Sequence, residues 1–136
     1  MTIGLDMMGG DFAPMEIIKG IQFYFKENPD KSALVLIGDV EQIKEQLKGY
    51  PLPEQSIRIV HASQVIDMHE HPTKALREKQ QSSIAVGFHL LAKGKIDSCI
   101  SSGNTGAMLV GSLYALKPIQ GVLRPTISTI IPKENG

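Results

Sequence analysis

The stretch Ile96–Gly111, IDSCISSGNTGAMLVG, predicts a strand, a polar turn and a helix in succession. The short apolar run before Ser101 is typical of a buried strand, and apolar residues at helical spacing resume at Ala107. The first amides of a helix have no partner within the helix and carry partial positive charge. A corner of this kind therefore accommodates an anion.

The turn itself supplies two kinds of anion-binding group. Two glycines let the backbone approach a ligand closely, and four polar residues add hydroxyl or amide groups. The glycines are Gly103 and Gly106, and the polar residues are Ser101, Ser102, Asn104 and Thr105. An ordinary helix cap uses the same residue types, so the local pattern leaves both interpretations open. The turn has neither the Walker pattern nor the dinucleotide glycine pattern, so nucleotide binding gains no support.

Apolar runs and helical patterns alternate along the rest of the chain. Strands are expected at 3–5, 33–37, 57–60, 96–100 and 126–131. Helices are expected after Pro14, after a capping box of Asp39 and Gln42, after Ser82, and after the turn at Gly106. This alternation predicts one α/β domain over residues 1–136, a three-layer α/β/α sandwich around a largely parallel sheet.

The segment DMMGGD at Asp6–Asp11 predicts a second strand–turn–helix corner, with Gly9 and Gly10 making the turn. Ligands of parallel sheets bind beyond the carboxyl ends of the strands, so this corner is expected at the same rim as the 101–106 turn. The simpler interpretation, which the local pattern favours, is that Asp11 caps the helix and Asp6 stabilises the turn.

A locally basic segment supplies a third candidate at this rim. Lys74 and Arg77 lie three residues apart and would share one helical face, as a phosphate clamp requires. A solvated charged face is the commoner explanation of such a run. His69 and His71 lack a Cys, Asp or Glu set at metal spacing, so we expect exposed loop histidines and no metal site.

The composition restricts the class of protein. The formal charge is zero and the isoelectric point is about 6.9, so nothing in the overall charge favours nucleic acid as a partner. The single cysteine, Cys99, lies in an apolar strand pattern, which predicts a buried thiol in a reduced, cytoplasmic protein and a poor nucleophile. No signal-peptide pattern opens the chain, and no apolar run reaches the roughly 20 residues that a bilayer requires.

Four motifs together resemble the PlsX family of bacterial phosphate acyltransferases. They are DMMGGDFAP at 6–14, HPTKALREKQQSS at 71–83, SGNTGA at 102–107, and GVLRP at 121–125. Each motif is weak alone, but their order and spacing match the family over nearly the whole chain. Met7 and Ser102 are mild departures, because alanine is more frequent at both positions in the family.

The resemblance implies transfer of a long-chain fatty acyl group from acyl carrier protein to inorganic phosphate, which gives acyl phosphate for phospholipid synthesis. It also implies a fold similar to phosphotransacetylase and to isocitrate and isopropylmalate dehydrogenases, and it calls for no cofactor. A homodimer in the full-length protein and peripheral membrane association are further expectations. Family members are much longer, so we expect this chain to be an N-terminal portion.

If the resemblance holds, the phosphate lies on the amides and hydroxyls of the turn. The phosphate-binding residues are then Ser102, Gly103, Asn104, Thr105 and Gly106. The catalytic residues are Lys74, Arg77 and Asn104, and the supporting residues of the first corner are Asp6, Gly9, Gly10 and Asp11. Arg124 is a lesser candidate.

Two alternatives stay open from the sequence. One is a phosphotransacetylase-like enzyme that uses a coenzyme A thioester, which shares the anion-binding logic and differs in the acyl donor. The other is a truncated, non-catalytic module that binds phosphate and does not complete an active site.

Overall fold

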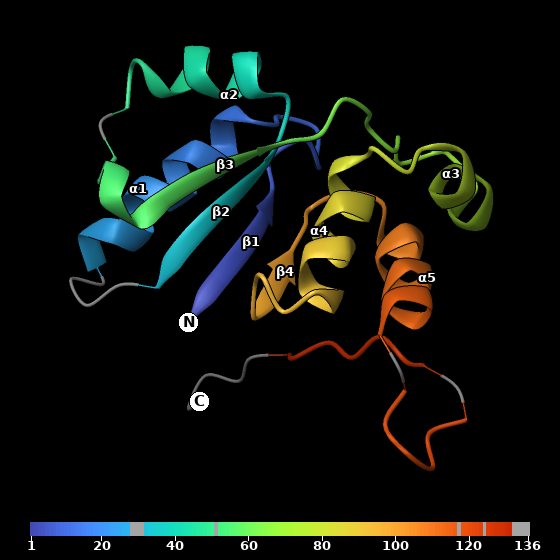
Figure 1. The fold of residues 1–136 in the computed structure, drawn as a ribbon. Helices are drawn as coiled ribbons and strands as arrows, with labels where there is room; N and C mark the ends of the chain where they lie inside the picture. The colour runs from blue at the N-terminus through green and yellow to red at the C-terminus, as the bar shows by residue number, and fades with distance from the viewer. Residues whose placement is uncertain (28–31, 51, 117, 124, 132–136) are drawn as a thin grey trace.

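A parallel sheet of four strands forms the centre of the molecule, in the order β3–β2–β1–β4 (Figure 1). The strands are β1 (Thr2–Asp6), β2 (Ala33–Gly38), β3 (Ile57–His61) and β4 (Ser98–Ile100). The structure is a computed structural model that describes residues 1–27, 32–50, 52–116, 118–123 and 125–131. All described strand pairs are parallel, so the strands end at one common rim.

Helices cover both faces of the sheet, which confirms the three-layer α/β/α arrangement (Figure 1). The helices are α1 (Met15–Glu27), α2 (Val40–Leu47), α3 (Pro72–Glu78), α4 (Ser83–Ala92) and α5 (Thr105–Ala115), with a short 3₁₀ turn at Glu54–Ser56. α1 and α2 lie on one face. α4 packs over β1, β2 and β4 on the other face, and α5 and α3 pack beside α4 and beside each other.

The central strand β2 is buried on both faces, as its unbroken apolar sequence predicts. Leu34 and Leu36 point to the α1 and α2 side, where they join a core with Ile18 and Ile43. The alternate residues of the strand, Val35 among them, face a second core on the α4 side. One strand thus contributes to both hydrophobic layers.

Two predicted helix caps, at Asp39 and Ser82, are confirmed, and Asn104 provides a third cap, which the sequence left as one of two interpretations. The Asp39 carboxylate accepts the Gln42 N–H at 2.8 Å, and the Ser82 hydroxyl accepts the Ala85 N–H at 3.3 Å. At the start of α5, the side-chain oxygen of Asn104 accepts the Ala107 N–H at 2.9 Å. Each side chain satisfies one of the amides that a helix start leaves without a partner.

Two expectations about strands need correction. The run 96–100 does form a strand, but only over the three residues of the edge strand β4, and Ile100 is 53% exposed because its side chain lines an open groove beside α1. Residues 126–131 form no strand. Ile130 is 92% exposed, and the segment has no strand partner within the described residues (Figure 1). An alternating apolar pattern gives a strand only where another backbone pairs with it.

The buried position of Leu36 predicts its contribution to stability. Replacing Leu36, which is fully buried, by alanine removes packed methyl groups and leaves a cavity between β2 and the helices. We expect Leu36→Ala to lower the free energy of unfolding by about 2–5 kcal/mol in urea titrations followed by circular dichroism. Phe23→Ala on the solvent side of α1 is the control, with a change within about 0.5 kcal/mol. Equal effects of the two substitutions would contradict the packing described above.

Candidate functional site

The loops after β1 and β4 meet at the carboxyl rim of the sheet. Leu5 and Ile100 are partners in the β1–β4 register, so the residues that follow them lie side by side. Asp6, buried at the end of β1, accepts the Met8 N–H at 3.0 Å. Its other carboxylate oxygen accepts the Ser101 hydroxyl at 2.6 Å. Asp6 therefore stabilises its own turn, as predicted, and also binds the turn after β4.

The two turns approach each other too closely for a side chain to stand between them. A Cβ atom at Gly9 would lie 2.6 Å from the Gly103 nitrogen, and one at Gly103 would lie 3.2 Å from the Gly9 Cα. Gly10 adopts a φ of +98°, a conformation that favours glycine, and lies against Ser102. The structure thus brings Gly9, Gly10, Gly103 and Ser102 together at one place.

Asn104 connects the turn to a third loop, at 65–71. Its side-chain oxygen caps α5, while its side-chain nitrogen donates to the main-chain carbonyls of Asp67 and Glu70 at 2.9 and 3.0 Å. The same nitrogen lies 3.4 Å from the Met68 carbonyl. Asn104 is buried, and both ends of its amide are engaged. Its side chain is therefore a structural clamp, whereas its backbone N–H has no acceptor among the described residues.

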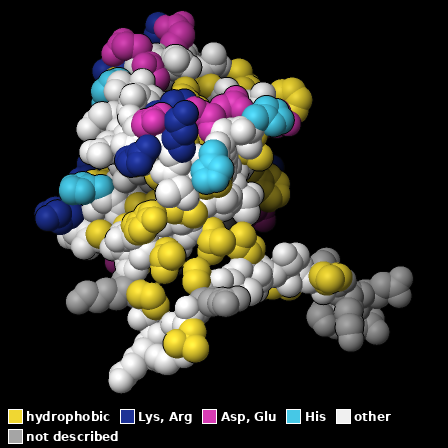
Figure 2. All heavy atoms as spheres, turned by 90° about the vertical axis from the view of Figure 1, so that its right-hand side faces the viewer, with side chains coloured by type: hydrophobic (Ala, Val, Ile, Leu, Met, Phe, Trp, Pro, Cys, Tyr) yellow, Lys and Arg dark blue, Asp and Glu magenta, His cyan; other side chains and the backbone are white. Residues whose placement is uncertain are grey.

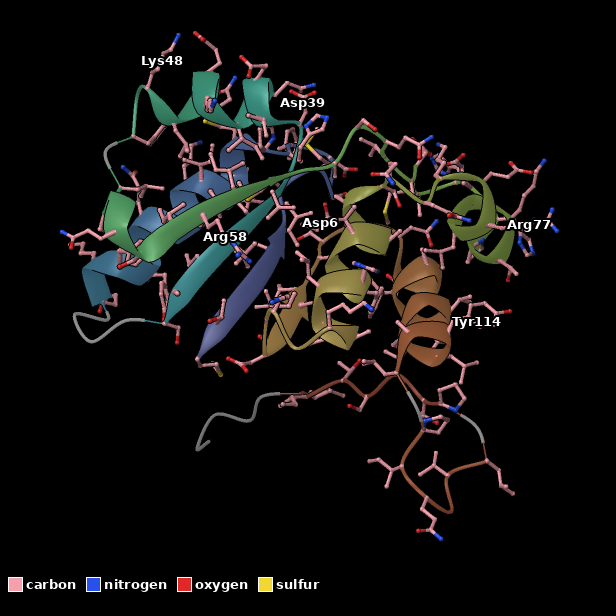
Figure 3. All side chains as sticks on the ribbon, in the orientation of Figure 1. Asp6, Asp39, Lys48, Arg58, Arg77 and Tyr114 are labelled. Atoms are coloured by element: carbon pink, nitrogen blue, oxygen red, sulfur yellow. The ribbon has the colours of Figure 1, made fainter. Side chains whose placement is uncertain are left out.

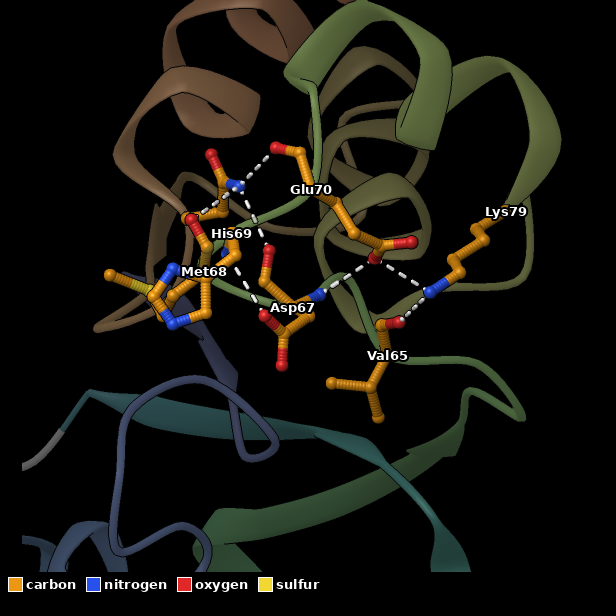
Figure 4. Close-up of polar contacts among 7 residues, drawn as sticks. Val65, Asp67, Met68, His69, Glu70 and Lys79 are labelled. Atoms are coloured by element: carbon orange, nitrogen blue, oxygen red, sulfur yellow. Dashed lines mark hydrogen bonds and ion pairs between the residues drawn. The ribbon is translucent and has the colours of Figure 1, made fainter.

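An ion pair holds the 65–71 loop from its other side (Figure 4). The Glu70 carboxylate accepts the Lys79 ammonium at 2.6 Å and the Asp67 N–H at 2.8 Å. Lys79 also donates to the Val65 carbonyl at 2.8 Å. These hydrogen bonds, with that from Lys79 the larger, lower the pKa of Glu70. This pair could not be predicted from the sequence, because its members lie nine residues apart in a segment of weak periodicity.

α3 starts against the beginning of α5. A Cβ atom at Gly106 would lie 2.4 Å from the Pro72 ring, so the two helix starts touch at this point. Lys74 is exposed in the first turn of α3, next to this contact. The structure therefore places the helix that carries Lys74 beside the 101–106 turn.

Arg77 lies away from the turn. It lines a groove of about 520 Å³ between α3, α4 and the second half of α5, together with Phe88 and Tyr114. Its guanidinium is 4.0 Å from the Glu78 carboxylate, and Figure 3 shows the side chain directed outward from the body of the molecule. Figure 2 views the molecule from this side, where charged and histidine side chains gather above hydrophobic ones. Lys74 and Arg77 therefore do not form a common clamp on the turn.

Three backbone amides at the start of α5 have no acceptor within the described residues. The Gly103 N–H donates to the Ser101 hydroxyl at 3.0 Å, and the Ala107 N–H is bound by the Asn104 cap. Within the described part of the chain, the N–H groups of Asn104, Thr105 and Gly106 donate to no protein acceptor. They lie where the helix dipole is positive, so this is the most favourable position for an anion in the candidate site.

The remaining predicted residues have other positions. Asp11 is exposed, and the structure gives it no hydrogen bond or ion pair within the described residues; it does not cap α1, which begins at Met15. The prediction of a cap at Asp11 is therefore wrong, because the chain makes a further turn before the helix starts. Arg124 lies outside the described residues. His69 and His71 are exposed, as expected.

Cys99 is not a nucleophile of this site. Burial, and to a lesser extent the negative charge of Asp6, raise the pKa of the Cys99 thiol to about 11, so the thiolate is scarce at neutral pH. No group of three or more His, Cys, Asp or Glu residues suited to a metal ion occurs among the described residues. Over the same residues, no helix has the length and apolar character needed to cross a bilayer.

An apolar groove of about 420 Å³ opens beside the turn. It is lined by residues of α1, β1 and β4, and Ser102 of the turn is among its lining residues. Its walls are largely aliphatic and include Ile3, Leu5, Ile17, Ile21 and Ile100. A polar, amide-rich turn and an apolar groove are therefore adjacent at this rim.

Comparison with known proteins shows which family this chain resembles over its whole length. The family model described as fatty acid synthesis protein matches residues 1–136. A protein named phosphate acyltransferase from Dictyoglomus turgidum is 48% identical over 132 residues, which cover 97% of this chain and 39% of that protein. Proteins of the same name from Endomicrobium trichonymphae and Caldicellulosiruptor bescii are 43% and 40% identical, and the matches cover 41% and 40% of their lengths. The chain thus spans about two fifths of the length of the curated relatives it matches.

Because Asn104 clamps the 65–71 loop, we expect an amide and a carboxylate at position 104 to differ strongly in the free energy of unfolding of the protein. Asn104→Asp keeps the oxygen that caps α5 but places a second oxygen against the Asp67 and Glu70 carbonyls. We expect it to lower the free energy of unfolding by about 2–3 kcal/mol, since the carbonyls lose their donor inside the protein. The measurement is urea unfolding at neutral pH. Asn104→Ser, which keeps a capping oxygen without adding charge, should cost less; an Asn104→Asp variant as stable as the wild type would disprove the clamp.

Proposed function

This chain belongs to the fatty acid synthesis protein family, and on that premise we propose that the whole protein transfers a fatty acyl group to inorganic phosphate. The name shared by the relatives, phosphate acyltransferase, supports this class of reaction. The observation that carries the proposal is the set of three unpartnered amides at the start of α5, beside an apolar groove. The product is an acyl phosphate for phospholipid synthesis.

In this proposal the phosphate binds to the backbone at Asn104, Thr105 and Gly106. Exposed hydroxyl groups at Ser102 and Thr105 add donors at the same place. Gly103 contributes by close packing instead of by its amide, which Ser101 already accepts. Lys74 supplies positive charge from the adjoining helix start, and Arg77 has no part in phosphate binding because its side chain lines the groove with Tyr114.

The reaction needs no nucleophile from the protein. A phosphate oxygen attacks the thioester carbonyl carbon, negative charge develops on the carbonyl oxygen, and the carbon–sulfur bond then breaks to release the thiolate. The protein has to hold the two reactants together and stabilise the developing oxyanion. Preorganised amides and the Lys74 ammonium suit both tasks. Asp6 and its glycine neighbours keep the turn in place without touching the substrate.

The groove that Ser102 lines supports an acyl chain as the second substrate group. Its floor and wall are built from Leu5, Ile17 and Ile100, and burial of methylene groups against such side chains is favourable. A chain lying in the groove would present its carbonyl end to the turn. Ligand sites commonly combine apolar walls with a few convergent polar groups, as this one does.

The resemblance to the PlsX family supports the remaining parts of the proposal. The acyl donor is acyl carrier protein, and the whole protein is a homodimer that associates peripherally with the membrane in the cytoplasm. If the enzyme used a coenzyme A thioester in preference to acyl carrier protein, it would instead be a phosphotransacetylase-like enzyme. A comparison of the two thioesters at equal concentrations separates these donors.

We expect the whole protein to form acyl phosphate from palmitoyl-acyl carrier protein and phosphate. Hydroxylamine converts acyl phosphate to a hydroxamate, and the amount of hydroxamate should depend on added phosphate.

Substitution at Thr105, the first residue of α5, tests the phosphate site. Proline is tolerated at the first position of a helix. It removes the amide donor together with the Thr105 hydroxyl, so the loss of the hydroxyl is measured separately. Thr105→Pro should lower kcat/KM for phosphate roughly tenfold or more.

Thr105→Ala is the matched control for this experiment. It removes the hydroxyl and keeps the amide, so most of the activity should remain. Circular dichroism shows whether both variants are folded. Equal activity of the proline and alanine variants would remove the α5 amides from the proposal, and a wild-type protein without phosphate-dependent hydroxamate would refute the reaction itself.

Lys74 should act on phosphate without contributing to folding. Lys74→Ala removes one exposed cation beside the start of α5, so the KM for phosphate should rise roughly tenfold while the thermal midpoint stays unchanged. Lys44→Ala removes an exposed cation from α2, far from the turn, and serves as the control. A Lys74→Ala variant with the phosphate KM of the control would show that the segment is only a solvated face.

A further inference from the structure

Asp6 and Ser101 form a hydrogen-bonded pair that joins the two turns of the candidate site. Asp6 is 2% exposed, and one of its carboxylate oxygens accepts the Ser101 hydroxyl at 2.6 Å. Its other oxygen accepts the Met8 N–H at 3.0 Å. A buried carboxylate is costly unless it is hydrogen-bonded. Both contacts therefore hold the end of β1 against the end of β4.

Ser101 transmits this constraint to the residues that follow it. The Ser101 hydroxyl has one proton, which it donates in the hydrogen bond to Asp6. The Ser101 oxygen can therefore only accept further hydrogen bonds. The Gly103 N–H donates to that oxygen at 3.0 Å. The amide of Gly103 is thereby directed to Ser101, and the first amide available to a ligand is that of Asn104.

We propose that Ser101, held by Asp6, is a positioning residue that fixes the 102–106 turn in its phosphate-binding conformation, an inference that rests on the proposed function. Ser101 itself touches neither phosphate nor acyl group. It acts through Gly103, whose backbone lies against the Gly9 backbone. This contact restricts the path of the chain between Ser101 and α5. The order of the contacts, Asp6 to Ser101 to Gly103, determines where α5 begins.

The pair requires a carboxylate at position 6. The Met8 N–H and the Ser101 hydroxyl both donate, one to each oxygen of Asp6. An asparagine side chain has one oxygen and one NH₂ group, so it could accept only one of these two bonds in the present arrangement. If its oxygen accepts the Met8 N–H, its NH₂ group would donate to the Ser101 oxygen, and the Ser101 proton would lose its acceptor.

The test is a titration of the ¹⁵N-labelled chain with inorganic phosphate, followed by amide shifts in nuclear magnetic resonance spectra. In the wild type, the largest shifts are expected at Asn104, Thr105 and Gly106, with little change at Gly103. Ser101→Ala should weaken phosphate binding roughly tenfold or more, and the Gly103 amide, freed from its acceptor, should begin to respond to phosphate. Loss of stability alone would not produce that response.

Three further variants keep the result interpretable. Ser101→Thr keeps the hydroxyl and should bind phosphate nearly as well as the wild type. Ser101→Cys keeps the size but weakens both hydrogen bonds, so it replaces the alanine variant if that variant does not fold. Ser112→Ala removes another hydroxyl, which donates to the Leu109 carbonyl within α5, and should leave phosphate binding unchanged.

The outcomes separate this inference from the proposed function. A folded wild-type chain that binds no phosphate at Asn104–Gly106 would overturn the phosphate site, and the inference with it. Binding by the wild type with equal affinity in Ser101→Ala or Ser101→Cys would overturn the inference alone. Weaker binding in these variants, recovery in Ser101→Thr and an altered Gly103 response together support the positioning role.

Discussion

The contact between the Gly9 and Gly103 backbones is the constraint on which the rim of the sheet depends. A side chain at either position would push the turns after β1 and β4 apart, because a Cβ at Gly9 already lies 2.6 Å from the Gly103 nitrogen. Separated turns could not keep the Asp6–Ser101 hydrogen bond. The central strand β1 and the edge strand β4 thus share one corner, and the start of α5 takes its position from that corner.

Much of the fold could be predicted because its signals are local. Caps such as Ser82 and Asn104 act within three or four residues of themselves, and the unbroken apolar run of β2 follows from burial on both faces. The candidate site was predictable only in outline. Ser101 and Asp6 are 95 residues apart, and no spacing rule connects residues at that distance. Their pairing follows from the sheet register alone.

The errors have a common physical cause. Helical spacing indicates that Lys74 and Arg77 share a face, but it does not tell where that face points, and the packing of α3 beside α5 decides it. In the same way, the residues at 126–131 have a strand-like pattern without a strand partner in the described structure. The binding of the Asn104 side chain to the 65–71 loop, more than 30 residues earlier in the chain, likewise has no local signal. In each case the presence or absence of a tertiary contact decided the outcome, and the local pattern did not.

The available amides of Asn104, Thr105 and Gly106 have a chemical consequence for recognition. Peptide N–H groups keep their protons across the physiological pH range, unlike a histidine side chain, whose charge changes near neutral pH. Anion binding by these amides is therefore not lost through a change in their own protonation when the pH rises or falls. Any change of affinity that originates at these amides must then come from the ligand, through the ionisation state of the anion itself.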